Sequence, residues 1–592
     1  MNKKVRLIFA DFEKEYIIND SPFILDFLQK NNIFIDALCS GEGKCKKCLV
    51  NLDGEFVLAC QTKINKDSTI ILQQKNLYKT KEEIFFNEVK NKYKEFPLIK
   101  KIYIDFSLQI KQPYISDFDF LNLILQKENL IISELNNISL LNKLNNYIHS
   151  QSKVIIYLLK TNEKYELINI TEKIENKNIG LAIDLGTTTI SISAVDFDNV
   201  NILDTINFYN PQIIYGADII HRIIFSLKKE NREKIQQSLI NGLSQAIKFL
   251  LNKNKINSDE ITAIVISGNT TMIHLFLGLN AKYIREFPYS PVSNNFSKIQ
   301  AKQFFDFLNY ANIFIIPSVA NYLGGDLVSG AAYCNLINTH ENSLLIDLGT
   351  NGEIILASNG ILAGCACSAG PAFEGLGLNC GERYSEGVVF DVNYNNEKFH
   401  YFIAGETKPK GICGTGVISL LRHLYEKKYI DKRGKFTDKI TDKLNNKKIF
   451  ILFDEKSTAH NKIIYIDEID IDNILRAKAA IFAGMKLLLK KFELDFYDIN
   501  KFYISGGIGN SLNIENSIYI GLLPKLSIDK FLFVGNTSLT GAIYYLLYDE
   551  IRKQINEVAK KITYFDLSNE TEYTDEFLAA LFIPHTDEKL FL

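Results

Sequence analysis

Two segments of the chain repeat one pattern of apolar and polar positions. Residues 179–196 read IGLAIDLGTTTISISAVD: an apolar run ends at Asp184, a Gly-Thr turn follows, and the next segment alternates apolar and polar positions. Residues 342–358, NSLLIDLGTNGEIILAS, repeat this order with Asp347 163 positions after Asp184. Short apolar runs on both sides of a glycine turn are typical of paired strands. Each segment therefore predicts a strand–turn–strand unit.

A second pattern also occurs twice, each time after one of these units. Residues 263–276 (AIVISGNTTMIHLF) and 501–514 (KFYISGGIGNSLNI) are apolar runs that enter a Ser-Gly turn and continue into a helix-like segment. The chain thus has two halves of similar order, and the second has extra length around residues 390–470. We predict a duplicated α/β domain over residues 177–592.

The part of the chain before residue 177 predicts two smaller domains. Residues 5–10 and 15–19 predict a hairpin, and residues 21–32 predict a helix with serine at its N-cap and proline at its first position. Further along, strand-like and helix-like runs alternate, which suits a small α/β domain. The predicted divisions are an N-terminal domain (1–76), a Lys- and Glu-rich linker (77–97) and a middle domain (98–176).

Composition and charge exclude several classes of protein. The chain has 592 residues, 46% of them apolar and 23% charged, with a net charge of −2, so no overall field favours nucleic acid or an anionic membrane. Asp and Glu occur among the first residues, before the apolar core of a signal peptide could form. No run of 18 uncharged apolar residues occurs, so the sequence predicts no membrane-spanning helix. We expect a cytoplasmic protein, in which paired cysteines serve metal or redox chemistry.

Four of the nine cysteines lie within 22 residues, as Cys39, Cys45, Cys48 and Cys60 in the spacing C-x5-C-x2-C-x11-C. Four thiolates suit zinc or an iron–sulfur cluster. Three ligands on one glycine-containing loop, with the fourth downstream, are the layout of ferredoxin-type [2Fe–2S] domains, and strand–strand–helix–loop is the order of the ferredoxin β-grasp. We predict a [2Fe–2S] cluster, with zinc as the alternative. The x11 gap is far shorter than in plant ferredoxins.

The two aspartate turns predict a nucleotide site. Glycine lets the backbone turn tightly, so that its N–H groups and the threonine hydroxyls can surround phosphate oxygens, and an aspartate at the strand end can hold Mg²⁺. Two such turns form a clamp for ATP with Mg²⁺, and we take Asp184 and Asp347 as its candidate catalytic residues. The glycine-rich turn at 505–511 offers a surface for adenine, and residues 324–331 predict a helix start at the hinge between the halves. The candidate nucleotide-binding residues are Gly186, Thr187, Thr188, Gly268, Asn269, Gly324, Gly325, Asp326, Gly349, Thr350, Asn351, Gly352, Gly506, Gly507 and Asn510.

These motifs together resemble a known family. The paired hairpins and the glycine-rich turn are similar to the acetate and sugar kinase/Hsc70/actin superfamily, whose halves are ribonuclease-H-like. An N-terminal [2Fe–2S] ferredoxin module joined to such an ATPase domain resembles the reductive activators of corrinoid-dependent methyltransferases. Further similar phrases are NPQIIYGADIIHRI (210–223), GNTTMIHLFLGL (268–279), AGPAFEGLGL (369–378), GICGTGVISLL (411–421) and FIPH (582–585).

The resemblance implies an enzyme that hydrolyses ATP and delivers one electron from the cluster, reducing inactive cobalt(II) of a corrinoid protein to cobalt(I). It implies an upstream low-potential reductant and a homodimer with contacts in the middle domain. No D-x-H-x-x-G motif for a histidine-ligated corrinoid occurs in the sequence, so the cobalt belongs to a partner. Some relatives carry more cysteines for [4Fe–4S] clusters near the C-terminus, whereas here none follows Cys413.

Two alternatives come from other classes of protein. One is a small-molecule kinase regulated by the cluster, for which Asp326 is the nearest candidate base. The other is a redox-sensing scaffold that binds ATP without catalysis. The remaining cysteines do not match a metal-site spacing, and we expect small buried thiols at Cys334, Cys365, Cys367, Cys380 and Cys413.

Overall fold

The chain folds into two compact units. The first unit contains Met1–Asn91, Thr339–Asn536 and Phe565–Leu592, and the second contains Lys92–Asn338 and Thr537–Tyr564. Each is described by itself below. The computed structural model describes residues 3–9, 12–30, 49–53, 55–71, 94–133, 137–161, 164–173, 176–216, 218–349, 351–375, 377–382, 384–405, 407–507 and 512–591.

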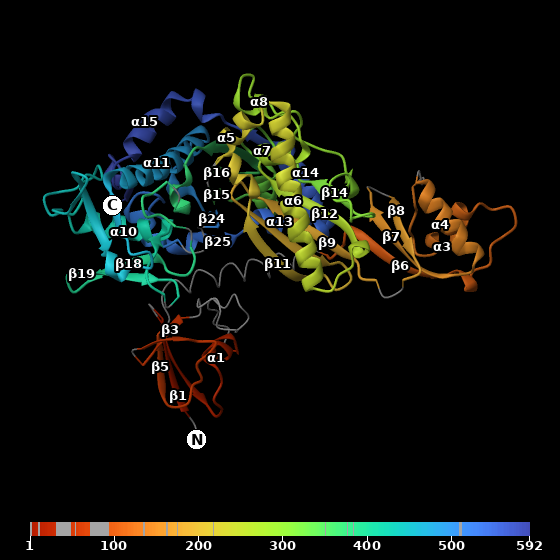
Figure 1. The fold of residues 1–592 in the computed structure, drawn as a ribbon, viewed down its shortest axis with the longest axis horizontal. Coiled ribbons are helices and arrows are strands. Elements are labelled where there is room, and N and C mark those ends of the chain that lie inside the picture. Colours follow the sequence, from red (N-terminus) through yellow and green to blue (C-terminus); the bar gives the residue numbers. More distant parts are fainter. Residues whose placement is uncertain are drawn as a thin grey trace. The chain divides into compact units, whose positions relative to one another are not determined.

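The large sheet of the second unit contains the first aspartate hairpin (Figure 1). Its strand order is β11-β10-β9-β12-β14-β13, with β9 antiparallel to β10 and parallel to β12. Helix α6 packs on one face through Leu239, Leu243 and Ile247, which are fully buried with the apolar residues of β9 and β12. The elements are β9 (Ile179–Leu185), β10 (Thr189–Asp196), β11 (Asn201–Tyr209), α5 (Ile219–Phe225), α6 (Lys229–Lys253), β12 (Ile261–Gly268), α7 (Thr270–Leu277), α8 (Lys282–Arg285), β13 (Ile299–Gln300), β14 (Asn312–Ile315), α9 (Gly325–Tyr333), α13 (Thr537–Leu547), α14 (Asp549–Lys561) and β26 (Ile562–Tyr564).

The large sheet of the first unit repeats this topology around the second hairpin. The strands that this unit contributes follow the order β25-β24-β15-β16-β17, with β15 antiparallel to β16 and parallel to β24. The register is also repeated, since Ser267 lies opposite Asp184 in one sheet and Ser505 lies opposite Asp347 in the other. The predicted duplication of an α/β domain is therefore confirmed. The strands are β15 (Ser343–Leu348), β16 (Gly352–Ser358), β17 (Ile361–Cys367), β24 (Lys501–Ser505) and β25 (Phe531–Gly535).

The extra length of the first unit forms two small sheets and the helices around its core. Helices α10 and α11 supply much of the buried apolar cluster, including Val417, Leu421 and Met485. Helix α15 packs on α11. The elements are β18 (Val388–Asn395), β19 (Lys398–Ile403), β20 (Gly411–Ile412), α10 (Gly414–Glu426), β21 (Lys443–Leu444), β22 (Lys447–Phe453), β23 (Ile464–Asp467), α11 (Glu468–Lys491), α12 (Ile514–Tyr519) and α15 (Thr571–Ala580).

The N-terminal residues form a separate small sheet in the order β2-β1-β5-β3-β4. Strand β1 is antiparallel to β2 and parallel to β5, and α1 packs on the sheet with Val5, Leu7, Leu28 and Ile70 fully buried. The predicted hairpin is confirmed, while the helix begins at Ile24, two residues after the predicted first position. The elements are β1 (Lys3–Phe9), β2 (Phe12–Ile18), α1 (Ile24–Lys30), β3 (Leu49–Leu52), β4 (Glu55–Leu58) and β5 (Ser68–Ile71).

Residues of the predicted middle domain form a three-stranded sheet, β6-β7-β8, covered by two helices. Each helix begins at a side-chain cap, because Ser116 Oγ accepts from the Asp119 amide and Asn137 Oδ1 from the Leu140 amide. The elements are β6 (Ile99–Asp105), α3 (Asp117–Gln126), α4 (Ile138–His149), β7 (Lys153–Lys160) and β8 (Tyr165–Thr171). The domain divisions after residues 76, 97 and 176 stay predictions.

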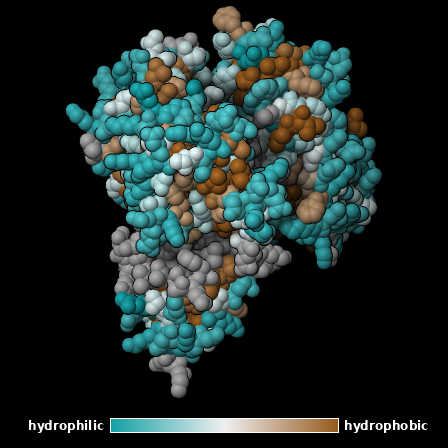
Figure 2. All heavy atoms as spheres, turned by 60° about the vertical axis from the view of Figure 1, so that its left-hand side comes forward, coloured by the Kyte–Doolittle hydropathy of each residue, from teal (hydrophilic) through white to brown (hydrophobic). Residues whose placement is uncertain are grey.

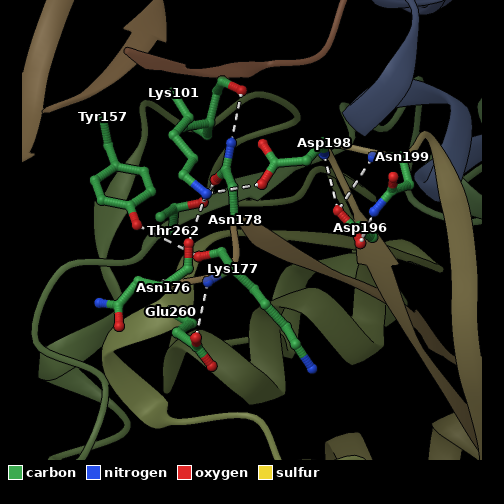
Figure 3. A network of polar contacts seen from close by, with 11 residues as sticks. Lys101, Tyr157, Asn176, Lys177, Asn178, Asp196, Asp198, Asn199, Glu260 and Thr262 are labelled. Atoms are coloured by element: carbon green, nitrogen blue, oxygen red, sulfur yellow. Dashed lines mark hydrogen bonds and ion pairs between the residues drawn. The ribbon is translucent and has the colours of Figure 1, made fainter. Parts of the chain in front are cut away.

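A polar network joins this small sheet to β9 and β12 (Figure 3). Asn178 is 1% exposed; its Nδ2 donates to the Ile99 carbonyl (3.1 Å) and its Oδ1 accepts from Thr262 Oγ1 (2.9 Å). Beside it, the Lys177 amide donates to Glu260 Oε1 (2.8 Å). Buried polar groups that satisfy one another in this way are costly to separate. The network therefore fixes the segment between β8 and β9.

Replacing Asn178 by alanine should lower the stability of the second unit by about 2 kcal/mol, because the buried Ile99 carbonyl and Thr262 hydroxyl each lose a partner. In calorimetry the corresponding transition should move down by about 4–8 °C. The matched control is Asn199→Ala, which removes an exposed amide bonded to Asp196 (2.8 Å) and should change little. Equal stability of the Asn178→Ala protein and the native chain would contradict this interpretation of the junction.

The surface is mostly polar. Figure 2 shows hydrophilic residues over most of the face in view, with separate apolar patches between them. Among the helices that the structure describes, none is long and apolar enough to cross a membrane.

Candidate functional site

The first aspartate lies at the carboxyl end of β9 and is held by a helix from the far end of the chain. Ser538, at the start of α13, donates from Oγ to Asp184 Oδ1 at 2.7 Å. The Ser538 and Ser267 hydroxyls lie 2.9 Å apart, and Ser267 and Ser329 also lie 2.9 Å apart. A row of hydroxyls thus fixes the orientation of a half-buried carboxylate.

The glycine turn after this aspartate is held by two asparagines. Asn210 donates from Nδ2 to the Gly186 carbonyl (2.9 Å), and its backbone amide donates to the Thr188 carbonyl (2.9 Å). Asn269 donates from Nδ2 to Thr187 Oγ1 (3.0 Å), while its Oδ1 caps α7. The turn is therefore preorganised with its backbone oxygens already paired.

The start of α9 completes this cluster. A Cβ atom added to Gly324 would lie 2.4 Å from Asn269 Cα and 2.8 Å from the Gly268 carbonyl oxygen, so only glycine permits the approach. Asp326 Oδ1 accepts from the Leu327 amide (2.9 Å). The second unit thus brings together all the residues predicted there: Asp184, Gly186, Thr187, Thr188, Gly268, Asn269, Gly324, Gly325 and Asp326.

The second aspartate has a matching environment within the first unit. Ser505, at the end of β24, donates from Oγ to Asp347 Oδ2 at 2.9 Å. Gly506 follows with φ of 95°, and a Cβ atom there would lie 2.6 Å from the Leu348 carbonyl oxygen. The Gly349 amide donates to the Asn351 carbonyl (3.1 Å) and closes the hairpin that continues at Gly352. Gly507 is exposed next to this turn, and the predicted residues Thr350 and Asn510 lie outside the described residues.

Each hairpin therefore offers one oriented carboxylate beside backbone N–H groups and hydroxyls. In the part of the chain that the structure describes, no group of three or more His, Cys, Asp and Glu is suited to a metal ion. Mg²⁺ keeps several waters and binds through one or two carboxylates plus substrate phosphates. The oxygen donors of the hairpins fit such an ion.

Of the four predicted cluster ligands, the structure describes Cys60 alone, and Cys39, Cys45 and Cys48 lie outside the described residues. Cys60 follows β4 and is 6% exposed. The turn around it is fixed to α1, since the Leu25 amide donates to the Ala59 carbonyl and the Ile24 amide to the Thr62 carbonyl, both at 2.9 Å. A thiol that is fixed at the edge of a β-grasp sheet is suited to act as a thiolate ligand of zinc or of an iron–sulfur cluster.

Four of the five later cysteines are buried thiols, as predicted, whereas Cys380 is only partly buried. Cys334, Cys365, Cys367 and Cys413 are buried, and Cys380 is intermediate. Burial raises the pKa of the Cys334 and Cys367 thiols well above the usual value. A thiol that resists ionisation is a poor metal ligand and a poor nucleophile.

Sequence reasoning missed two residues that shape the first hairpin. Ser538 lies in a serine- and threonine-containing helix with no motif of its own, and its contact with Asp184 spans 354 positions. Asn210 was visible in the phrase NPQIIYGADIIHRI but had no assigned role. An asparagine directly before proline is a usual cap for a short helical turn, which was the available signal.

Comparisons with known proteins agree with this architecture. Residues 179–339 match a family model described as the RACo middle region, and residues 341–592 match the C-terminal domain of RACo, the ASKHA domain. A solved structure named as a reductive activator for corrinoid, iron-sulfur protein is 33% identical and covers 99% of both chains with a TM-score of 0.78. The chain belongs to this family of reductive activators. Its large domain is therefore of the ASKHA type, as the paired hairpins predicted.

Two curated relatives extend the family. The corrinoid activation enzyme RamQ of Eubacterium limosum is 27% identical over 593 residues, covering 97% of this chain and 98% of the relative. The [Co(II) methylated amine-specific corrinoid protein] reductase of Methanosarcina barkeri is 24% identical over 420 residues, covering 65% and 73%. The first is named for corrinoid activation and the second for the reduction of a Co(II) corrinoid protein.

Proposed function

We propose that this chain is an ATP-dependent reductive activator that gives one electron to the cobalt(II) centre of a corrinoid protein and restores cobalt(I). The observation that carries the proposal is likeness over 99% of the chain to a protein named as a reductive activator. The duplicated hairpins with oriented aspartates support the ATP-dependent part, and the cysteine set supports the electron-transfer part.

The electron carrier is a [2Fe–2S] cluster held by Cys39, Cys45, Cys48 and Cys60. Such a cluster supplies a one-electron couple near about −400 mV in plant-type ferredoxins. The buried position of Cys60 keeps its sulfur out of water, and the hydrogen bonds from α1 to the surrounding turn hold it in place. Gln61 Nε2 lies 3.6 Å from this sulfur and provides a donor at the site.

The two hairpins bind MgATP. Asp184 and Asp347 hold the ion directly or through water, and the serine hydroxyls keep the two carboxylates oriented. The turns at Gly186 and Gly349 direct backbone N–H groups at phosphate oxygens, and after the tight turn at Gly506 the open space at Gly507 gives room for the adenosine. Thr187, Thr188, Gly268, Asn269, Gly324, Gly325, Asp326, Thr350, Asn351, Gly352 and Asn510 complete the proposed set.

ATP is needed because the transfer runs uphill. Each 100 mV by which the cobalt couple lies below the donor costs about 2.3 kcal/mol for one electron. A nucleotide shifts an equilibrium only through its different affinity for two states. We place those two states in the complex with the corrinoid partner. In one state the cobalt centre of the partner is inaccessible to the electron donor, and in the other it is accessible.

Reduced protein mixed with a corrinoid protein held as cobalt(II) should form cobalt(I) quickly with MgATP and barely without it. The absorbance of cobalt(I) follows the reaction. Nucleotide should leave the redox titration of the isolated activator unchanged. A shift of its cluster potential by about 100 mV or more, worth about 2.3 kcal/mol, would place the coupling inside this chain and overturn the proposal for the partner.

Two partners complete the proposal: an upstream low-potential reductant and a second copy of this chain. Leu108, Ile110 and Tyr114, between β6 and α3, are 77%, 91% and 107% exposed. Apolar side chains so fully exposed in one short segment support homodimer contacts through the predicted middle domain, residues 98–176.

A further inference from the structure

Arg222 is a buried cation with few partners. The residue lies in α5 and is 0% exposed. Its Nε donates to the Gly216 carbonyl (2.9 Å) and its Nη1 donates to the thioether sulfur of Met272 (3.3 Å), while its Nη2 has no hydrogen-bond partner among the described residues. A guanidinium has five N–H donors and a thioether is a weak acceptor, so most of this group is unsatisfied.

Among the described residues, no carboxylate forms an ion pair with Arg222, and the charge of Asp218 offsets only part of the effect of burial on its pKa. Asp218, one turn earlier, instead accepts from the His221 backbone amide (2.9 Å) and lies 2.8 Å from His221 Nδ1. Burial lowers the pKa of the guanidinium to about 10, which leaves it charged at neutral pH.

Side-chain contacts connect this cation to the first hairpin turn and to the start of α7. Met272, which Arg222 contacts, is in the first turn of α7, and its amide donates to Asn269 Oδ1 (2.9 Å). Asn269 in turn donates to Thr187 Oγ1. Asn210 lies 4.0 Å from the same sulfur and donates to the Gly186 carbonyl. The Gly186 turn and the Asn269 turn before α7 are therefore each linked to the guanidinium through one or two side chains.

We propose that Arg222 is a buried counter-charge that favours nucleotides carrying more phosphate. The inference rests on the proposed function, because it needs ATP at the first hairpin. An unpaired buried cation is unfavourable for folding, and an apolar residue of similar volume is often at least as stable. An anion at the nearby loops recovers this loss, since charges interact strongly where water is excluded. The gain in binding free energy increases with the negative charge of the phosphates. The positive N-terminal end of the α7 dipole adds to it.

The test compares three ligands that share the adenosine group and differ in the number of phosphates: MgATP, MgADP and adenosine. Calorimetric titration of Arg222→Met should show MgATP binding weaker by about tenfold or more, MgADP weakened less, and adenosine unchanged. Arg222→Lys keeps the charge and should keep most of the preference for MgATP. Arg285→Gln removes a partly exposed cation of the same unit, near Glu286, and should bind all three as the native chain does.

Thermal unfolding without ligand provides an independent readout. The melting temperature of Arg222→Met should equal or exceed that of the native chain, because a poorly satisfied charge is removed. An unfolded variant would contradict the proposal, as would equal losses for all three ligands or no loss for MgATP. If the native chain itself binds no MgATP, the proposed function fails; if it binds MgATP and Arg222→Met binds it equally well, this inference alone fails.

Discussion

Serine in place of Cys48 should yield a colourless protein that contains no iron. A hydroxyl is a hard, weakly acidic ligand, whereas iron in these clusters requires soft thiolates, so three remaining cysteines do not hold the group. The native protein should be brown and contain two irons and two sulfides. Visible absorption and elemental analysis measure both results. ATP binding should persist, because the hairpins belong to separate buried cores.

The matched control is Cys413→Ser. Cys413 is also buried, and its sulfur already lies 3.3 Å from the Thr415 hydroxyl, so a serine there keeps a polar neighbour. That variant should retain the full iron content and colour. One zinc and no iron in the native protein would refute the cluster assignment and restore the zinc alternative.

Local patterns were enough to predict the core of the large domain. The strands β9 and β15 are buried on both faces, so each is a nearly continuous apolar run, and glycine after the aspartate marks the turn. The Ser-Gly repeats then predicted a second element common to both halves, a strand that enters a turn and continues into a helix. The structure places Ser267 opposite Asp184 and Ser505 opposite Asp347, which is the same arrangement in each half.

The sequence could not predict with which unit the C-terminal segment 537–564 folds. Residues 537–564 follow strands of the first unit yet fold with the second, where α13 packs on α9 and on β9. Gly541 faces Ser329 so closely that an added Cβ atom would lie 2.5 Å from its Cβ. Such packing brings together residues more than two hundred positions apart in the sequence. No periodic pattern within a short segment of the chain predicts a contact of this kind.

One local signal was overlooked. Residues 49–58 read LVNLDGEFVL and form the hairpin of β3 and β4, and Asp-Gly between apolar runs is a strong hairpin signal. Asp53 has φ of 54°, the left-handed conformation that such a turn requires. This hairpin leads directly to Cys60 and places it at the edge of the sheet.

Alanine in place of Asp184 or Asp347 should each lower Mg²⁺-dependent ATP hydrolysis by about a hundredfold or more. The ion neutralises charge on the transferred phosphoryl group and is worth several kcal/mol, and each 1.36 kcal/mol is a factor of ten in rate. Both losses should be similar, because each carboxylate is oriented by a serine hydroxyl at 2.7–2.9 Å. Steady-state phosphate release at varied Mg²⁺ measures the effect.

The control variants distinguish a loss of Mg²⁺ binding from a loss of folding. Asp184→Asn keeps an oxygen that can accept from Ser538, so it should fold as the native chain does and still hydrolyse ATP poorly, since the charge that holds Mg²⁺ is lost. Asp472→Ala removes a surface carboxylate that pairs with Arg476 at 2.6 Å and should change turnover little, as exposed ion pairs contribute at most about 1 kcal/mol to stability. Normal hydrolysis by Asp347→Ala would remove the second hairpin from the ATP site. Because the two hairpins share strand order, register and serine partner, that result would also mean that duplicated geometry does not imply duplicated function.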